Sequence, residues 1–206
     1  MATNVLAFER FRAHWTAIGA PGESARAAYD TLLAAWDEPH RAYHTRRHLE
    51  TCLVAFDACT SAFSDPDVAG LALWYHDAVY NPLATDNEAR SVELARHHLA
   101  GAPPDAVERI AGLIDATRHA AEPSSPDACL VVDIDLGILG ASPERYAAYE
   151  DEIRREYAVF PDELFRPGRA AILRRFLVGP IFRTPQFAHL ESQARRNLGW
   201  AIDRLG

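Results

Sequence analysis

The ten residues Leu71–Tyr80 are almost entirely apolar, yet they carry His76 and Asp77 side by side in their middle. The stretch contains no Gly or Pro and lies between polar segments, so we predict a buried helix. A carboxylate in such a helix costs free energy unless it is paired or bound to a metal. Neighbours on a helix point about 100° apart, so both can reach one ion only in a cleft between their directions. Any further ligands must then come from other helices.

The length and charge of the chain narrow the classes of protein that it can be. Its 206 residues are 49% hydrophobic, which suits one globular domain, although the length also permits two small ones. A formal charge of −8 argues against generic nucleic-acid binding, because phosphate backbones require a basic surface. The net charge does not exclude a local basic pocket that binds a small phosphate.

The compartment follows from three negative observations. Residues 1–10 carry charges where a signal peptide needs an apolar core, and no segment approaches the roughly 18 apolar residues of a membrane span. The three cysteines, Cys52, Cys59 and Cys129, form no CxxC pair and indicate a reducing environment. We therefore expect a cytoplasmic protein that does not bind a membrane.

Nearly every segment has the pattern of a helix, so we expect an all-α protein. Only Leu130–Ile134 has β-branched character, and it has no partner strand. We predict helices over 4–18, 25–36, 43–63, 65–81, 86–99, 104–119, 129–139, 142–159, 168–178 and 186–205.

Other His and Asp residues lie on helices before and after His76 and Asp77. His44 and His48 are four residues apart, so they share the helix face that also carries Cys52. Downstream, Asp133 and Asp135 lie in an apolar run. The order His, His-Asp, Asp provides imidazoles and carboxylates, a mixed set that suits Mn, Fe, Co, Ni, Zn or Mg.

This ordered pattern on a helical chain resembles the HD superfamily of metal-dependent phosphohydrolases. Five motifs resemble a bacterial branch of predicted phosphohydrolases within it: YHTRRHL (43–49), ALWYHDAVY (72–80), DNEARS (86–91), ATRHA (116–120) and DIDLGILG (133–140). The resemblance implies one HD-type helical bundle over 1–206, with a core at about 43–140 and flanking helices in 1–42 and 141–206. It places the metal ligands, for one ion or two, on His48, His76, Asp77 and Asp135.

The resemblance also implies an activity, the hydrolysis of a nucleotide or another small phosphoester by a metal-activated water. Asp77 would bridge a second ion or orient the nucleophile, Glu88 would line the cleft, and Arg118 would hold the non-reacting oxygens. The candidate substrate-binding residues are His44, Arg47 and His119. The partner expected is thus a small phosphorylated molecule, and a homodimer is left open.

Simpler roles compete for the histidines. His76 and Asp77 could form a hydrogen-bonded pair without a metal. His44 could hold a phosphate, orient a ligand or merely pack. His119 could bind a second metal or the substrate, or it could be a cation favoured by a helix C-terminus.

Simpler roles also compete for the charged residues and for the function as a whole. Arg47 could be solvated on a helix face, and Glu88 could be a favourable first-turn charge behind an N-cap at Asp86. An HD-fold sensor that binds a metal or nucleotide without turnover is the main alternative function. A third candidate function is that of the diiron oxygenases of the same fold. These enzymes need more His ligands, and His44 and His119 are the only spare candidates for them.

The two acids of the run 131–135 should differ in role. On a helix they point about 200° apart. Asp135 shares an apolar, inward face with Val131, Ile138 and Leu139, whereas Asp133 lies nearer the expected helix start, where an acid favours the dipole. We predict that Asp135 binds metal and that Asp133 mainly contributes stability. If the segment began as an extended strand, both acids would share one face.

Overall fold

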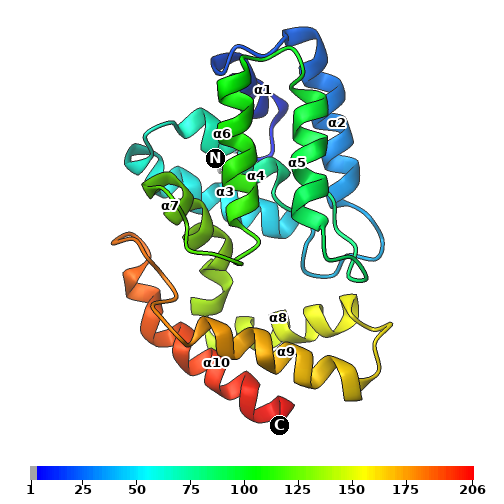
Figure 1. Cartoon of the computed structure of the whole chain (residues 1–206), viewed down its shortest axis with the longest axis vertical. Helices are drawn as coiled ribbons and strands as arrows, with labels where there is room; N and C mark the ends of the chain where they lie inside the picture. Colours follow the sequence, from blue (N-terminus) through cyan, green and yellow to red (C-terminus); the bar gives the residue numbers. More distant parts are fainter. Residues whose placement is uncertain (1–3) are drawn as a thin grey trace. The chain divides into compact units, whose positions relative to one another are not determined.

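The computed structural model describes residues 4–206, and among these it contains helices and no strand (Figure 1), which confirms the all-α prediction. Residues 1–3, part of the segment considered above as a signal peptide, lie outside the described residues. No helix within 4–206 is both long and apolar enough to cross a membrane. The α-helices are α1 (Phe8–Ala17), α2 (Ala25–Trp36), α3 (Arg46–Cys59), α4 (Pro66–Tyr75), α5 (Asn87–His98), α6 (Pro104–Ala116), α7 (Pro126–Asp135), α8 (Pro143–Glu156), α9 (Asp162–Phe176) and α10 (Glu191–Leu205).

The chain divides into two compact units, one that ends at Val132 and one that begins at Asp133. The boundary falls inside α7, so this helix starts in the first unit and ends in the second. The expectation of one HD-type domain over 1–206 stays a prediction.

Helix α4 is the centre of the first unit. Every residue from Val68 to Tyr75 is buried, and the helix packs against α1, α3, α5 and α6. A helix that is apolar on all sides can be stable only when neighbours cover all of them. Its start is fixed by Pro66 in the first turn and by the Asp65 carboxylate, which accepts a hydrogen bond from the Val68 amide.

The predicted end of this helix was wrong. Helix α4 ends at Tyr75, so His76 is its C-cap and Asp77 lies in the turn that follows. Backbone groups of this turn find partners outside the helix. Arg41 donates to the carbonyls of Asp77 and Ala78, and the Ser91 hydroxyl accepts from the Val79 amide.

The second unit is built from α8, α9, α10 and the 3₁₀ turn Leu136–Gly140, and its core includes Tyr146, Leu173 and Leu198. The Asn197 side chain donates to the carbonyls of Leu139 and Ala141 and so joins α10 to that turn. Helix α9 begins at Asp162 rather than at the predicted residue 168. It continues through Pro167, the sixth residue of the helix, where proline supplies no N–H for an i→i−4 hydrogen bond.

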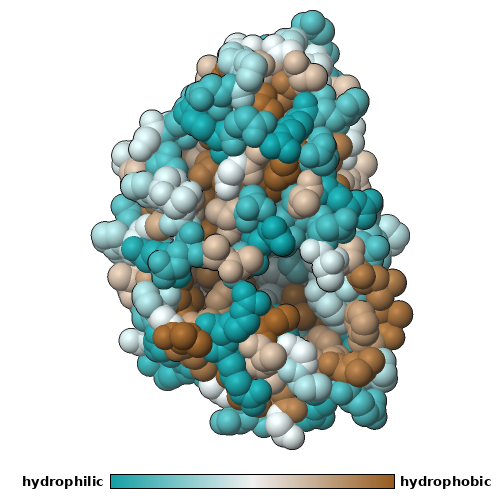
Figure 2. Space-filling model, in the orientation of Figure 1, coloured by the Kyte–Doolittle hydropathy of each residue, from teal (hydrophilic) through white to brown (hydrophobic). Residues whose placement is uncertain are grey.

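Exposed apolar residues are scattered. Figure 2 shows hydrophobic residues distributed among hydrophilic ones over the face drawn. Large apolar side chains that remain exposed within the second unit are Val159, Leu164, Ile172, Val178 and Trp200. Single exposed apolar residues of this kind are normal on a protein surface.

Candidate metal centre

Two buried imidazoles face each other in the first unit. His48, in the first turn of α3, and His76, at the end of α4, place their Nε2 atoms 3.1 Å apart, and their exposed fractions are 4% and 1%. The other nitrogen of His76, Nδ1, lies 2.8 Å from the Leu73 carbonyl oxygen. A carbonyl can only accept, so Nδ1 donates, and in the neutral ring Nε2 carries a lone pair.

A carboxylate joins the two rings. The Oδ2 atom of Asp77 lies 3.2 Å from His76 Nε2 and 3.7 Å from His48 Nε2. Nitrogen and oxygen atoms bonded to one ion at ~2.0–2.2 Å lie about 3–3.6 Å apart. The three separations fall in or just beyond this range, so His48, His76 and Asp77 have the chemistry and spacing of ligands for a single divalent ion. Separations of 3.1 and 3.2 Å are also those of hydrogen bonds among these side chains, as in a His–Asp pair without metal.

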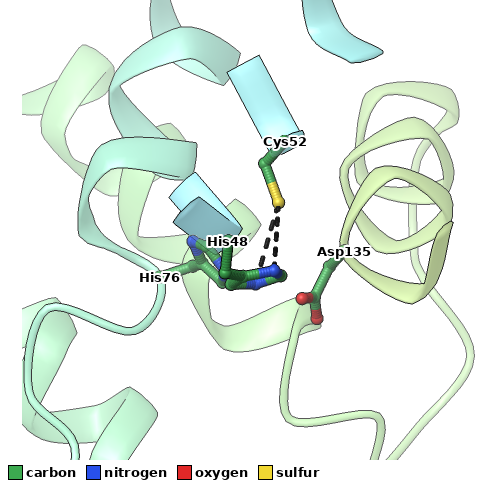
Figure 3. A group of neighbouring side chains, drawn as sticks. All are labelled: His48, Cys52, His76 and Asp135. Carbon is green, nitrogen blue, oxygen red and sulfur yellow. Dashed lines mark hydrogen bonds between the residues drawn. The ribbon is translucent and has the colours of Figure 1, made fainter. Parts of the chain in front are cut away.

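Cys52 adds a sulfur to this group. It lies one turn after His48 on α3, is 1% exposed, and places Sγ 3.7 Å from His48 Nε2 (Figure 3). His48, Cys52 and His76 each offer a ligand atom within 4.8 Å of the other two. The spacing of four between His48 and Cys52 signalled a shared face, yet the predicted ligand set did not contain Cys52.

The two acids of α7 have different surroundings. Asp133 is fully buried, and its carboxylate accepts hydrogen bonds from the Arg183 amide and from the amide and hydroxyl of Thr184 at 2.5–3.0 Å. Burial raises the pKa of the Asp133 carboxyl, and the bonds from Thr184 and Arg183 oppose that shift. Asp135 is the last residue of α7 and is partly buried. Figure 3 draws it together with His48, Cys52 and His76.

The prediction that Asp133 lies near the start of its helix, where the dipole favours an acid, was wrong. Because α7 begins at Pro126, Asp133 lies near the end of the helix and not near its start. Its carboxylate is held instead by backbone groups 50 and 51 residues away.

A buried arginine connects the two segments that carry the site. The Arg41 guanidinium donates to the carbonyls of His44, Asp77 and Ala78 at 2.7–3.1 Å and to the Glu38 carboxylate. Its side chain has no exposed surface. Arg41 thus ties the turn before α3 to the turn after α4, and nothing in its sequence context indicates this role.

His44 lies at the edge of the centre. Its ring stacks on Tyr80 with centroids 4.2 Å apart, and its Nε2 lies 3.9 Å from Asp77 Oδ2. This position suits either a contact with a bound substrate or the orientation of Asp77. His119 is partly buried in the turn after α6, at φ 52°, and not within that helix as predicted.

The charged residues that were predicted to line the site lie on the surface or in the first turn of a helix. Arg118 pairs with Asp115 at 3.4 Å on the surface, and Arg47 is exposed. Glu88 lies in the first turn of α5, and Asp86 stands at the N-cap position without a side-chain cap hydrogen bond. The roles of Arg118, Arg47 and Glu88 stay predictions.

Comparison with known proteins adds no assignment. No family model, no curated protein and no solved structure matches this chain. The geometry of the candidate centre is therefore the main basis for a functional proposal.

Proposed function

We propose that this chain is a metal-dependent phosphohydrolase of the HD type, acting on a nucleotide or another small phosphoester. The observation that carries the proposal is the convergence of His48 Nε2, His76 Nε2 and Asp77 Oδ2 at 3.1–3.7 Å. Asp135, which the resemblance to the HD pattern assigns as a ligand, is proposed as a further ligand.

The donor chemistry fits such a group. Neutral imidazoles and carboxylates bind divalent ions, and the two imidazoles of the centre are buried. The donation from His76 Nδ1 to the Leu73 carbonyl orients the ring and keeps Nε2 available, as a supporting hydrogen bond does in metal sites. A bound divalent ion supplies an activated water and stabilises charge on a phosphoryl group.

The remaining residues of the chain would bind and orient the substrate. His44, 3.9 Å from Asp77 and stacked on Tyr80, would donate to a phosphoryl oxygen beside the metal ligands. Arg118, Arg47, His119 and Glu88 are further candidates for contacts with substrate, and each is a separate target for mutation.

The first test is metal content followed by turnover. Purified protein should hold close to one divalent ion per chain, and His76→Ala and Asp77→Ala should each lose most of it while remaining helical. A panel of phosphomonoesters, nucleotides and cyclic nucleotides, assayed with Mn, Fe, Co, Ni, Zn and Mg, should give activity that a chelator abolishes. His97→Ala, at an exposed position on α5, is the matched control and should behave as wild type.

The outcomes separate the alternatives. If the protein binds no divalent ion on reconstitution, the proposal of a metal centre is wrong. A bound ion with no turnover across the panel would favour the sensor function over the enzyme.

A further inference from the structure

We propose that Cys52 binds the metal ion directly, and that its sulfur makes the centre select a thiophilic ion such as Zn(II) or Co(II) over Mg(II) and Mn(II). The inference rests on the proposed metal centre, and it narrows the broad set of ions that the imidazoles and carboxylates alone allow.

The first support is distance. A nitrogen at ~2.0–2.1 Å and a sulfur at ~2.3 Å from one tetrahedral ion lie about 3.5 Å apart. Cys52 Sγ lies 3.7 Å from His48 Nε2, close to this separation, and 3.8 Å from His48 Nδ1, so one of the two side chains turns when both bind the same ion. The approach is built into the helix, because residues four apart on α3 lie on one face.

The second support is a contrast between two cysteines of the same helix. The thiol of Cys59 donates to the Ala55 carbonyl at 3.2 Å, a local bond that a buried cysteine commonly makes. The sulfur of Cys52, one helical turn from His48, faces the ring nitrogens of that histidine. Cys52 as a small apolar residue that only fills the core is the competing explanation.

The selectivity follows from ligand softness. Thiolate favours Zn(II) and related ions, whereas carboxylate, carbonyl and water ligands suit Mg(II), Ca(II) and Mn(II). When the ion binds, the S–H bond breaks, the sulfur keeps the electron pair and forms the S–metal bond, and the proton leaves to solvent. A set of one sulfur, two imidazole nitrogens and carboxylate oxygen therefore suits Zn(II) and Co(II).

The test uses the full chain, stripped of metal and titrated with Co(II). Wild type should show the near-ultraviolet sulfur-to-cobalt charge-transfer band together with the visible bands of bound Co(II). Cys52→Ser should lose the charge-transfer band and keep visible bands, whereas the matched control Cys59→Ser should keep both. Cys52→Asp should reduce the ratio of Zn(II) to Mn(II) affinity at least tenfold.

A double variant that keeps Cys52 provides a test that does not depend on whether the Cys52 substitutions fold. In the double variant Cys59→Ser/Cys129→Ser, Cys52 is the one cysteine left in the sequence, and the charge-transfer band must persist. Bound Co(II) without that band in wild type, or an unchanged spectrum in Cys52→Ser, would overturn the role of Cys52 and leave the metal centre standing. No Co(II) binding in wild type would instead overturn the centre itself.

Discussion

Two carboxylates only two residues apart have different environments. Asp133 accepts hydrogen bonds from the Arg183 amide and from the amide and hydroxyl of Thr184, whereas Asp135 is a proposed metal ligand. Residues two apart on a helix point about 200° apart, which was the reason to expect different roles for the two acids. The metal-binding role of Asp135 stays a prediction. The partners of Asp133 could not be predicted, since they lie about fifty positions along the chain.

Asp133→Asn should lower the free energy of unfolding by about 1–3 kcal/mol, because an amide NH₂ would replace one carboxylate oxygen and each of the two oxygens accepts from a backbone amide. Urea unfolding measures this. Metal affinity should stay close to wild type.

Asp135→Asn is the matched comparison and should do the reverse, with metal affinity strongly reduced and a smaller loss of stability. Equal losses of metal affinity in the two variants would contradict this division of roles.

At the level of elements, the sequence predicted where helices form better than where they end. The range 25–36 agrees with α2, and the apolar stretch before His76 is the buried helix that was expected. The end of α4 was missed because no Gly or Pro marks it. Hydrogen bonds from Arg41 and Ser91, at distant positions, satisfy the backbone of the turn instead.

The same limit explains which parts of the site could be predicted. The resemblance to the HD pattern singled out His48, His76 and Asp77, and the structure brings them together. Cys52 carried a usable signal in its spacing from His48. Arg41 carried none, because its role depends on carbonyls that only the folded chain brings within reach.

Arg41→Met keeps the side-chain stem and removes every donor, so the carbonyls of His44, Asp77 and Ala78 would each lose a hydrogen bond. We expect a loss of about 2–4 kcal/mol in the free energy of unfolding. Metal affinity, measured by competition with a chelator where the variant is fully folded, should also fall. Arg41→Lys should recover part of the lost metal affinity, because the ammonium still reaches one or two of these carbonyl oxygens.

The control for this loss is Arg10→Met, which removes a partly exposed ion pair between Arg10 on α1 and Asp57 on α3. It should cost about 0–1 kcal/mol and leave metal affinity unchanged. If Arg41→Met bound metal as tightly as the control, Arg41 would be a general contributor to stability and not a positioning residue.

For the whole molecule, the division into two units bears on how metal binding affects stability. The candidate ligands His48, Cys52, His76 and Asp77 belong to the first unit, and α9, in the second unit, carries none of the proposed ligands. A ligand stabilises the structure that binds it by about 2.7 kcal/mol at a concentration one hundred times its Kd. Segments that open independently of the site receive none of this protection.

We therefore expect metal to slow amide hydrogen exchange in the segments that carry its ligands, and most of all in the second half of α4 and the first turns of α3. Mass-spectrometric exchange of the full chain, with and without Zn(II), measures this peptide by peptide. Amides in α9 should exchange at unchanged rates, and His76→Ala should remove the effect everywhere. Equal protection of α9 would show that the two units open as one, because only a shared unfolding transition transmits the binding free energy to every amide.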